Sequence, residues 1–453
     1  MISSDKIGRY FIRFYYLFAL PLQLTVCEAQ PVTNMAGGFA HSLFTKSDGS
    51  LWAMGWNNVG QLGDGNYTNA NRPERIVAGN VTSVAAGSKH SLFLKRGGSL
   101  WVMGLNSYGQ LGDGTYDNSN QPEQIMASNV AAVAAGSEHS LFLKRDGSLW
   151  VMGLNSYGQL GDGTYSNTNL PEQILASNVT AVAAGMYHSL FLKSDGSLWA
   201  MGDNLFGALG EVTYSGTNRP VQIVASNVTA IATGLGHSLI LKSDGSLWAM
   251  GLNIVGQLGD GTYNDTNRPE RIMASNVMAV AAGYDYSWFL KSDGSLWGMG
   301  SNEHGQLGDG TYDYTNQPEQ IMASNVTAIA AGYFHTLFLK GDGSLWGMGW
   351  NGYGQLGDGT LSNPLNDTNR PEQIVAGFPG YNLITIQLLS GGQVYLRYVG
   401  NPNAGYALDY SVNLAPADWM PVVTNSTDAN GVLSITNTPD AATNSFWRVR
   451  PVP

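Results

Sequence analysis

The stretch GMYHSLFLKSDGSLWAMG, Gly185–Gly202, decides the fold of this chain. Two short apolar runs flank the turn Ser194-Asp195-Gly196, which is typical of a β-hairpin in which the glycine adopts a positive φ. The stretch recurs along the chain with a constant step of 49 residues. Its SLW tryptophan stands at Trp52, Trp101, Trp150, Trp199, Trp248, Trp297 and Trp346. Seven copies of one unit therefore occupy residues 32–377.

Each unit contains four short apolar runs separated by turn residues, which predicts a four-stranded antiparallel meander with strands A to D. The runs are apolar on both faces, as expected for strands whose sheet is packed between two other sheets. A four-stranded unit of about 40 to 50 residues that repeats along a chain is typical of a β-propeller. The sequence therefore predicts an all-β fold with seven blades.

The repeated pattern GxxHSLFLKxDGSLWxMGxNxxGQLGDG resembles the repeat of the regulator of chromosome condensation family, whose members form seven-bladed propellers. The resemblance covers about three quarters of the chain. It implies a protein that binds partners through its loops. The nucleotide exchange of the founding member is not expected here, because the chain is acidic and has no basic tail. Similarity to a secreted propeller that inhibits β-lactamase implies inhibition of an extracellular enzyme as one specific form of binding.

The first 29 residues read as a secretory signal peptide. Three basic residues precede an apolar run at 14–26, and Cys27-Glu28-Ala29 resembles a small-x-small cleavage site. This pattern predicts a protein that is secreted or displayed at the cell surface. An uncleaved anchor is the alternative.

The repeat stops before residue 381. After a linker at 378–380, residues 381–453 contain some six short strand-like runs. Such a segment is similar to the small β-sandwich modules, of immunoglobulin or fibronectin type, that close many secreted bacterial proteins. The sequence therefore predicts a second, smaller β domain.

Composition argues against several classes of function. The chain has a formal net charge of −11 and no basic run, which disfavours nucleic acid as a partner. Its single cysteine, Cys27, lies inside the predicted signal, so no disulfide or cysteine nucleophile is expected in the mature protein. No other segment approaches the roughly 20 apolar residues of a membrane span. We expect a monomer without cofactor or metal, whose partner is a protein or a glycan.

His188 invites a catalytic interpretation, but the repeat argues against it. The histidine recurs at His41, His90, His139, His188, His237 and His335, and Tyr286 takes its place in copy six. Equivalent side chains around a ring cannot share one active site, so we expect an imidazole packed between blades and hydrogen-bonded to backbone. The QLGDG loops bring one carboxylate each, whereas calcium requires six to eight oxygens. We therefore interpret them as turns shaped by glycine.

The copies differ from one another at two places, the pair before the histidine and the four residues after the tryptophan strand. In a meander the A–B and C–D loops emerge on the same side, so both sets lie on one face, here called the varied face. It is rich in aromatic residues, which give binding surfaces large contact area at low entropic cost. We expect it to be a recognition surface, although aromatic residues that merely cover the blade ends are the alternative. Its candidate residues are Tyr108, Tyr157, Met186, Tyr187, Phe206, Tyr284, Tyr333, Phe334, Trp350 and Tyr353.

The sequence thus favours a secreted, non-enzymatic binding or scaffold propeller over two competing classes. One is a carbohydrate-active hydrolase or lyase, for which Asp285, Glu303 and His304 of copy six are the candidates, because a carboxylate pair can perform acid–base chemistry on glycosides. The other is a structural repeat protein that associates with itself in a surface layer.

Overall fold

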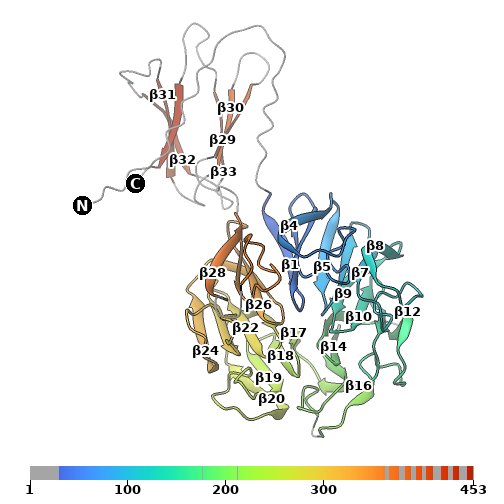
Figure 1. The fold of residues 1–453 in the computed structure, drawn as a ribbon. Coiled ribbons are helices and arrows are strands. Elements are labelled where there is room, and N and C mark those ends of the chain that lie inside the picture. Colours follow the sequence, from blue (N-terminus) through green and yellow to red (C-terminus); the bar gives the residue numbers. More distant parts are fainter. Residues whose placement is uncertain are drawn as a thin grey trace. The chain divides into compact units, whose positions relative to one another are not determined.

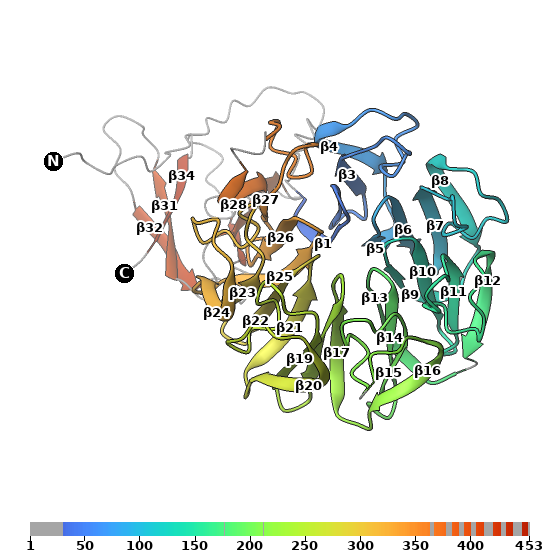
Figure 2. The same ribbon diagram turned by 60° about the horizontal axis from the view of Figure 1, so that its bottom comes forward.

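The computed structural model describes residues 30–175, 177–211, 213–362 and 367–376 in full, together with the backbone of six strands between residues 383 and 451. Residues 30–376 form one compact unit of seven four-stranded antiparallel sheets arranged in a ring (Figure 1). This arrangement confirms the seven-bladed propeller. The A strands lie at the centre of the ring and the D strands at its rim (Figure 2).

Every blade is built from one continuous segment, and its strands pair in chain order. The bounds of blades 1 to 4 are β1 (Val32–Gly37), β2 (His41–Lys46), β3 (Leu51–Gly55), β4 (Ala70–Val77), β5 (Val81–Ala86), β6 (His90–Lys95), β7 (Ser99–Gly104), β8 (Ser119–Met126), β9 (Val130–Ala135), β10 (His139–Lys144), β11 (Leu149–Gly153), β12 (Thr168–Leu175), β13 (Val179–Ala184), β14 (His188–Lys193), β15 (Leu198–Gly202) and β16 (Thr217–Val224). Those of blades 5 to 7 are β17 (Val228–Thr233), β18 (His237–Lys242), β19 (Leu247–Gly251), β20 (Thr266–Met273), β21 (Val277–Ala282), β22 (Tyr286–Lys291), β23 (Leu296–Gly300), β24 (Thr315–Met322), β25 (Val326–Ala331), β26 (His335–Lys340), β27 (Leu345–Gly349) and β28 (Thr368–Val375).

The B–C hairpin of each blade is fixed by its Asp-Gly turn. In blade 4, the Asp195 carboxylate accepts a hydrogen bond of 2.9 Å from the Ser197 amide, and Gly196 has a φ of 77°. A Cβ on Gly196 would lie 2.9 Å from the backbone nitrogen of Asn227 in blade 5. The glycine is therefore required by its own conformation and by the close approach of the next blade.

The core of the propeller lies between neighbouring blades. Between blades 4 and 5, Leu190, Leu198 and Leu209 of one sheet pack with Ile240 and Met250 of the next, and all five are fully buried. Equivalent clusters recur between successive blades around the ring. Burial on both faces explains why the strands are apolar throughout.

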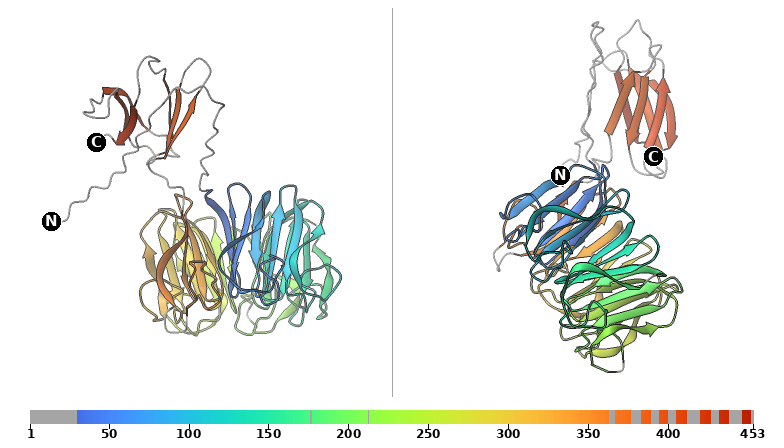
Figure 3. Two further views of the ribbon diagram at one scale, coloured as in Figure 1. Left: turned by 45° about the horizontal axis from the view of Figure 1, so that its top comes forward. Right: turned by 90° about the vertical axis from the view of Figure 1, so that its right-hand side faces the viewer.

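The ring closes through the same contacts that join its other blades. The Val81 amide at the start of blade 2 donates 2.9 Å to the carbonyl of Gly49 in the hairpin of blade 1. At the closing interface the Val32 amide of blade 1 donates 3.1 Å to the carbonyl of Gly343 in blade 7. Blades 7 and 1 therefore meet without a strand shared between the two ends of the propeller (Figure 3).

The C-terminal region contains six described strands, in two antiparallel sheets ordered β29-β30-β33 and β32-β31-β34. Their bounds are β29 (Leu383–Leu388), β30 (Val394–Val399), β31 (Gly405–Ser411), β32 (Met420–Ser426), β33 (Val432–Asn437) and β34 (Phe446–Pro451). The β-sandwich remains a prediction. The expected signal peptide at 1–29 and the linker at 378–380 lie outside the described residues. In the part that is described, no helix has the length and apolarity to cross a membrane.

Candidate functional site

The A–B and C–D loops emerge on the same face, as predicted. Tyr157 from the C–D loop of blade 3 stacks on Tyr187 from the A–B loop of blade 4, with ring centroids 4.3 Å apart. Phe39 from the A–B loop of blade 1 lies 5.9 Å from Trp350 in the C–D loop of blade 7. Both sets of varied residues therefore contribute to one surface.

The repeated histidines belong to the scaffold beneath this surface. His188 is buried, and its Nε2 lies 3.0 Å from the Oγ of Ser238 in the next blade. The Ser238 hydroxyl donates 2.8 Å to the carbonyl of Ala208, so it accepts its other hydrogen bond from the Nε2–H of His188. The partner is thus a serine side chain, not the backbone that the sequence led us to expect. The equivalent pairs are His41–Ser91, His90–Ser140, His139–Ser189, His237–Ser287 and, across the closing interface, His335–Ser42.

Burial keeps these histidines neutral. It lowers the pKa of His188 to about 4. It lowers the pKa of each of the other five to about 3. An imidazole that stays uncharged, paired and enclosed has a structural role, which supports the interpretation of His188 as scaffold.

Blade 6 replaces the histidine and adjusts its surroundings. The Tyr286 hydroxyl donates to blade 7, where the carbonyl oxygens of Gly332 and His335 lie at 3.0 and 2.6 Å. Trp288, two residues later, donates 3.1 Å to the hydroxyl of Thr336, which takes the place of the usual serine. A Cβ on Gly298 would lie 2.8 Å from the Trp288 ring, so glycine provides the space for the larger side chain. The replacement of histidine by Tyr286 therefore changes which residues pack and hydrogen-bond at this joint, and the residue keeps its structural role.

The QLGDG loops are turns shaped by glycine, as expected. In blade 1 the Asn57 amide donates 3.0 Å to the Asp64 carboxylate, and the Asn57 side-chain oxygen accepts 3.0 Å from the Leu62 amide. Gly63 has a φ of 76°, and a Cβ there would collide with Met103 of the next blade. Across the described residues, no three histidine, cysteine, aspartate or glutamate side chains are grouped as metal ligands would be.

Half of the candidate residues lie in one aromatic cluster on blades 6, 7 and 1. Phe39 is at its centre, with ring centroids 5.2 Å from Tyr333 and 5.7 Å from Phe334. At one edge Trp56 stacks on Tyr353 at 5.1 Å. Each ring stays partly exposed. The members of this aromatic cluster are Phe39, Trp56, Tyr284, Tyr333, Phe334, Trp350 and Tyr353.

The other five candidates lie elsewhere on the varied face. Tyr157 and Tyr187 form the stacked pair described above. Burial raises the pKa of Tyr187, and the neighbouring groups Tyr157, Glu138, Tyr284 and, least of all, Tyr108 raise it further. Phe206 occupies space left by a glycine of blade 5, since a Cβ on Gly236 would lie 2.9 Å from its ring. Met186 lies at the mouth of the central channel. The face therefore carries separate aromatic groups rather than one continuous patch.

Sequence reasoning missed two members of the aromatic cluster, Phe39 and Trp56. Both occupy varied positions in copy one, far in the sequence from the aromatic residues of copies six and seven. Closure of the ring makes the first and last copies neighbours. The predicted ring could therefore have identified both residues, because it places copy one beside copy seven.

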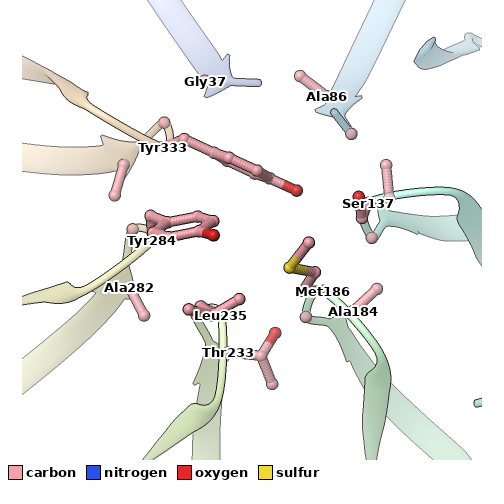
Figure 4. Close-up of a pocket in the computed structure, with 18 residues that line it drawn as sticks. Gly37, Ala86, Ser137, Ala184, Met186, Thr233, Leu235, Ala282, Tyr284 and Tyr333 are labelled. Carbon is pink, nitrogen blue, oxygen red and sulfur yellow. The ribbon is translucent and has the colours of Figure 1, made fainter. Parts of the chain in front are cut away.

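The channel mouth at the centre of the varied face holds a cavity of about 80 Å³ (Figure 4). Tyr333 extends across it towards Ser137, and Met186, Leu235 and Tyr284 line the remainder (Figure 4). Burial raises the pKa of Tyr333 to about 12, so its hydroxyl stays protonated. A cavity of this size has room for about two or three water molecules. A large ligand must therefore bind across the face rather than in the channel.

The three candidate catalytic residues of blade 6 are brought close together. The Gln257 amide donates 3.2 Å to Asp285, and burial together with the charge of Glu303 raises the pKa of Asp285 to about 6. Glu303 accepts 3.1 Å from the Tyr314 hydroxyl and lies 3.8 Å from Nε2 of His304. The other ring nitrogen of His304 pairs at 2.7 Å with Asp367, a buried carboxylate of blade 7. None of the three candidates lines the cavity at the channel mouth.

Comparison with known families finds the RCC1-like domain at residues 127–396. The regulator of chromosome condensation (RCC1) repeat matches at 48–94 and 97–143, and a second description of that repeat at 32–61 and 81–110.

Solved structures give the same fold. Human WBSCR16 is 27% identical over 69% of this chain and 87% of its own, with a TM-score of 0.63. Prp20p from Saccharomyces cerevisiae, described with its binding properties to Gsp1p and histones, is 21% identical over 79% of this chain and 90% of its own, with a TM-score of 0.65. Yeast RCC1 (Prp20) bound to Kap60 is 21% identical over 82% and 88%, with a TM-score of 0.63.

Proposed function

Because this chain belongs to the family of RCC1-like domains, we propose that it is a non-enzymatic binding protein that engages a protein partner through its varied face. The proposal includes a location outside the cell or at its surface, which the signal-like pattern in residues 1–29 supports. Inhibition of an extracellular enzyme is a specific form of the same function.

One observation carries this proposal. The repeated polar residues are used in the scaffold, as the enclosed histidine and serine pairs illustrate. The varied positions instead hold seven aromatic rings that touch one another and still reach solvent. Partly exposed aromatic clusters are the usual anchors of protein interfaces. Structures of Prp20p and of yeast RCC1 are described with protein partners, which supports a protein over a glycan.

The test compares partner capture by the full chain and by two variants. Phe334→Ala with Trp350→Ala removes two rings of the aromatic cluster. Met278→Ala is the control, because Met278 is exposed near the start of β21, at the end of the blade opposite the A–B loop. Proteins retained from culture supernatant and envelope extract are quantified by mass spectrometry. We expect a protein that the wild type and Met278→Ala retain and the double variant loses. If the double variant retained the same proteins as the wild type, the proposal would be contradicted.

A hydrolase or lyase remains the second candidate because of the carboxylates in blade 6. A carboxyl group with a raised pKa close to a second carboxyl group is the pairing used in acid–base catalysis, and Asp285 with Glu303 fits this description. The measurement is release of reducing ends from a polysaccharide panel. Turnover by the wild type that disappears in Asp285→Asn would favour this candidate over a pure binding role.

A further inference from the structure

Two carboxylates border the aromatic cluster on blade 6. Asp285 follows Tyr284 in the A–B loop, and Glu303 precedes His304 in the C–D loop. The His304 ring lies 5.2 Å from Phe334, which connects the carboxylates to the rings. Glu303 is about half exposed. A partner that covers the aromatic cluster therefore also covers these negative charges.

These carboxylates have no lysine or arginine beside them among the varied positions. The varied positions of blades 6, 7 and 1 contain neither residue type; they are 284–285, 301–304, 333–334, 350–353, 39–40 and 56–59. Burial and the charge of Glu303 both raise the pKa of Asp285, and no lysine or arginine of the described chain acts to lower it. Glu303 is about half exposed and, among the described residues, has only His304 near it as a basic group, at 3.8 Å, so the cost of burial falls mainly on Asp285. A cation from a partner would relieve that cost.

The opposite border of the aromatic cluster carries a lysine. Lys89, in the A–B loop of blade 2, places its ammonium 4.7 Å from the centre of the Trp56 ring. It is the one lysine or arginine among all varied positions of the seven copies. Burial raises the pKa of the Glu138 carboxyl in the A–B loop of blade 3, and the charge of the nearby Lys89 opposes that rise. The surface is thus negative at blade 6, aromatic across blades 7 and 1, and of mixed charge where blades 2 and 3 border it.

We infer that this surface is a docking site for a protein segment that presents an arginine or lysine next to apolar side chains. The inference rests on the proposed function and adds the chemistry of the partner. The apolar side chains pack on Phe334 and Trp350, while the cation reaches Asp285 and Glu303 and the faces of neighbouring rings. The carboxylates at blade 6 thereby place the basic end of the segment over that blade.

The test selects binders from a library of random 12-residue peptides displayed against the full-length chain. The enriched peptides are synthesised and their affinities are measured by fluorescence anisotropy. We expect an arginine or lysine adjacent to aromatic or aliphatic residues. Replacing the arginine by citrulline should weaken binding at least tenfold. Asp285→Asn with Glu303→Gln should cause a similar loss, and citrulline should then have little further effect. These isosteric changes preserve packing, and unchanged circular dichroism checks the fold.

Two controls separate failure of this inference from failure of the proposed function. Phe334→Ala with Trp350→Ala tests the aromatic cluster, and Tyr157→Ala with Tyr187→Ala tests the other aromatic group of the same face. If binding depends on either aromatic set but is unaffected by loss of the two carboxylates, the inference is wrong and the proposed function stands. If no peptide depends on any of these residues and partner capture is likewise unaffected, both are wrong.

Discussion

At the scale of the residue, the histidine and serine pair shows how a repeat uses a polar group inside an apolar core. The imidazole donates a hydrogen bond to a serine of the next blade, and that serine donates one to a backbone carbonyl of the histidine's own blade. The serine hydroxyl is thereby paired twice, whereas Nδ1 of five of the six imidazoles is buried without a hydrogen-bond partner among the described residues. Tyr286 meets the same need with a longer reach. The residue that looked most catalytic is therefore part of the joint between blades.

The buried histidines should make the propeller sensitive to mild acid. Their pKa falls from 6.5 to about 3 or 4 on folding, so below pH 6.5 the unfolded chain binds protons that the folded chain does not. Stability is therefore unaffected well above pH 6.5, and each histidine lowers it by up to about 1.4 kcal/mol per pH unit between pH 6.5 and its folded pKa of about 3 or 4. Asp285, Glu74, Glu138 and Glu372, whose pKa values burial raises, act in the opposite sense, but these four carboxyl groups are fewer than the six histidines. Urea unfolding at pH 7, 6 and 5 measures the effect, and constant stability across this range would refute it.

The glycine three residues before each histidine should tolerate no side chain. A Cβ on Gly185 would lie 2.5 Å from Cε1 of His188 and 2.8 Å from the carbonyl oxygen of Gly234. We expect Gly185→Ala to destabilise the propeller by about 1–3 kcal/mol, because the new methyl group overlaps the buried imidazole of His188 and a backbone carbonyl. Gly79→Ser is the matched control, since its nearest neighbour is 3.4 Å away and other copies carry serine there. Equal urea midpoints for the two variants would contradict this account.

At the scale of the element, blade 6 shows that substitutions within a sheet are accepted in sets. Trp288 takes the place of a leucine and is fully buried. Gly298, on the neighbouring strand directly opposite Trp288, takes the place of an alanine or valine found in blades 1 to 5. Thr336 across the blade interface receives the indole hydrogen bond. The sheet keeps its register, while the larger side chain of Trp288 is balanced by the smaller Gly298 opposite it and its indole is paired by Thr336 of blade 7.

Gly298→Ala should therefore destabilise blade 6, and a second change should repair it. The new Cβ would lie 2.8 Å from the Trp288 ring, and overpacking of this kind costs about 1–3 kcal/mol. Trp288→Leu combined with Gly298→Ala recreates the pair Leu239 and Ala249 of blade 5. We expect thermal unfolding to show a lowered Tm for the single variant and recovery in the double variant. A double variant less stable than the single one would show that the two positions are not coupled.

The strands and hairpins could be predicted because their signals are local and occur seven times. The Asp-Gly turns and the apolar runs between them define each blade without long-range information. The serine partner of His188 could not be assigned from one unit, because Ser238 is 50 residues away in the next blade. For the same reason Phe39 and Trp56 were missed at the candidate site. Contacts between blades depend on curvature, which no single repeat encodes.

At the scale of the whole molecule, the closing interface is one of seven equivalents. The Val32–Gly343 bond repeats the Val81–Gly49 bond, and His335–Ser42 repeats the histidine pairs elsewhere. The hydrogen bonds between blades thus run around the whole ring, although no peptide bond joins blade 7 to blade 1. The aromatic cluster lies across this junction, because it takes Phe39 and Trp56 from the first blade and Trp350 from the last. Closure of the ring and assembly of the candidate site are therefore linked.

Ser42→Ala and Ser91→Ala should have the same effect on stability. Each removes the hydroxyl that accepts from a histidine and donates 2.8 Å to a buried carbonyl, one at the closing interface and one between blades 1 and 2. Loss of such a bond inside a protein costs about 1–3 kcal/mol. Urea unfolding measures both variants. A clearly smaller loss for Ser42→Ala would mean that the closing interface is weaker than the others.

Blades that are each one continuous segment, with the same histidine–serine joint at six of seven interfaces, also constrain how such a chain arises. Residues 101–116 and 150–165 have the identical sequence WVMGLNSYGQLGDGTY, as expected after duplication of a unit within the gene. Recombination between two copies that share the histidine–serine joint adds or removes a whole blade and rebuilds the same joint. The interior is then under common selection in all copies, while the loops of each new copy are free to diverge. A protein of this design can acquire a new binding surface without having to evolve a new core.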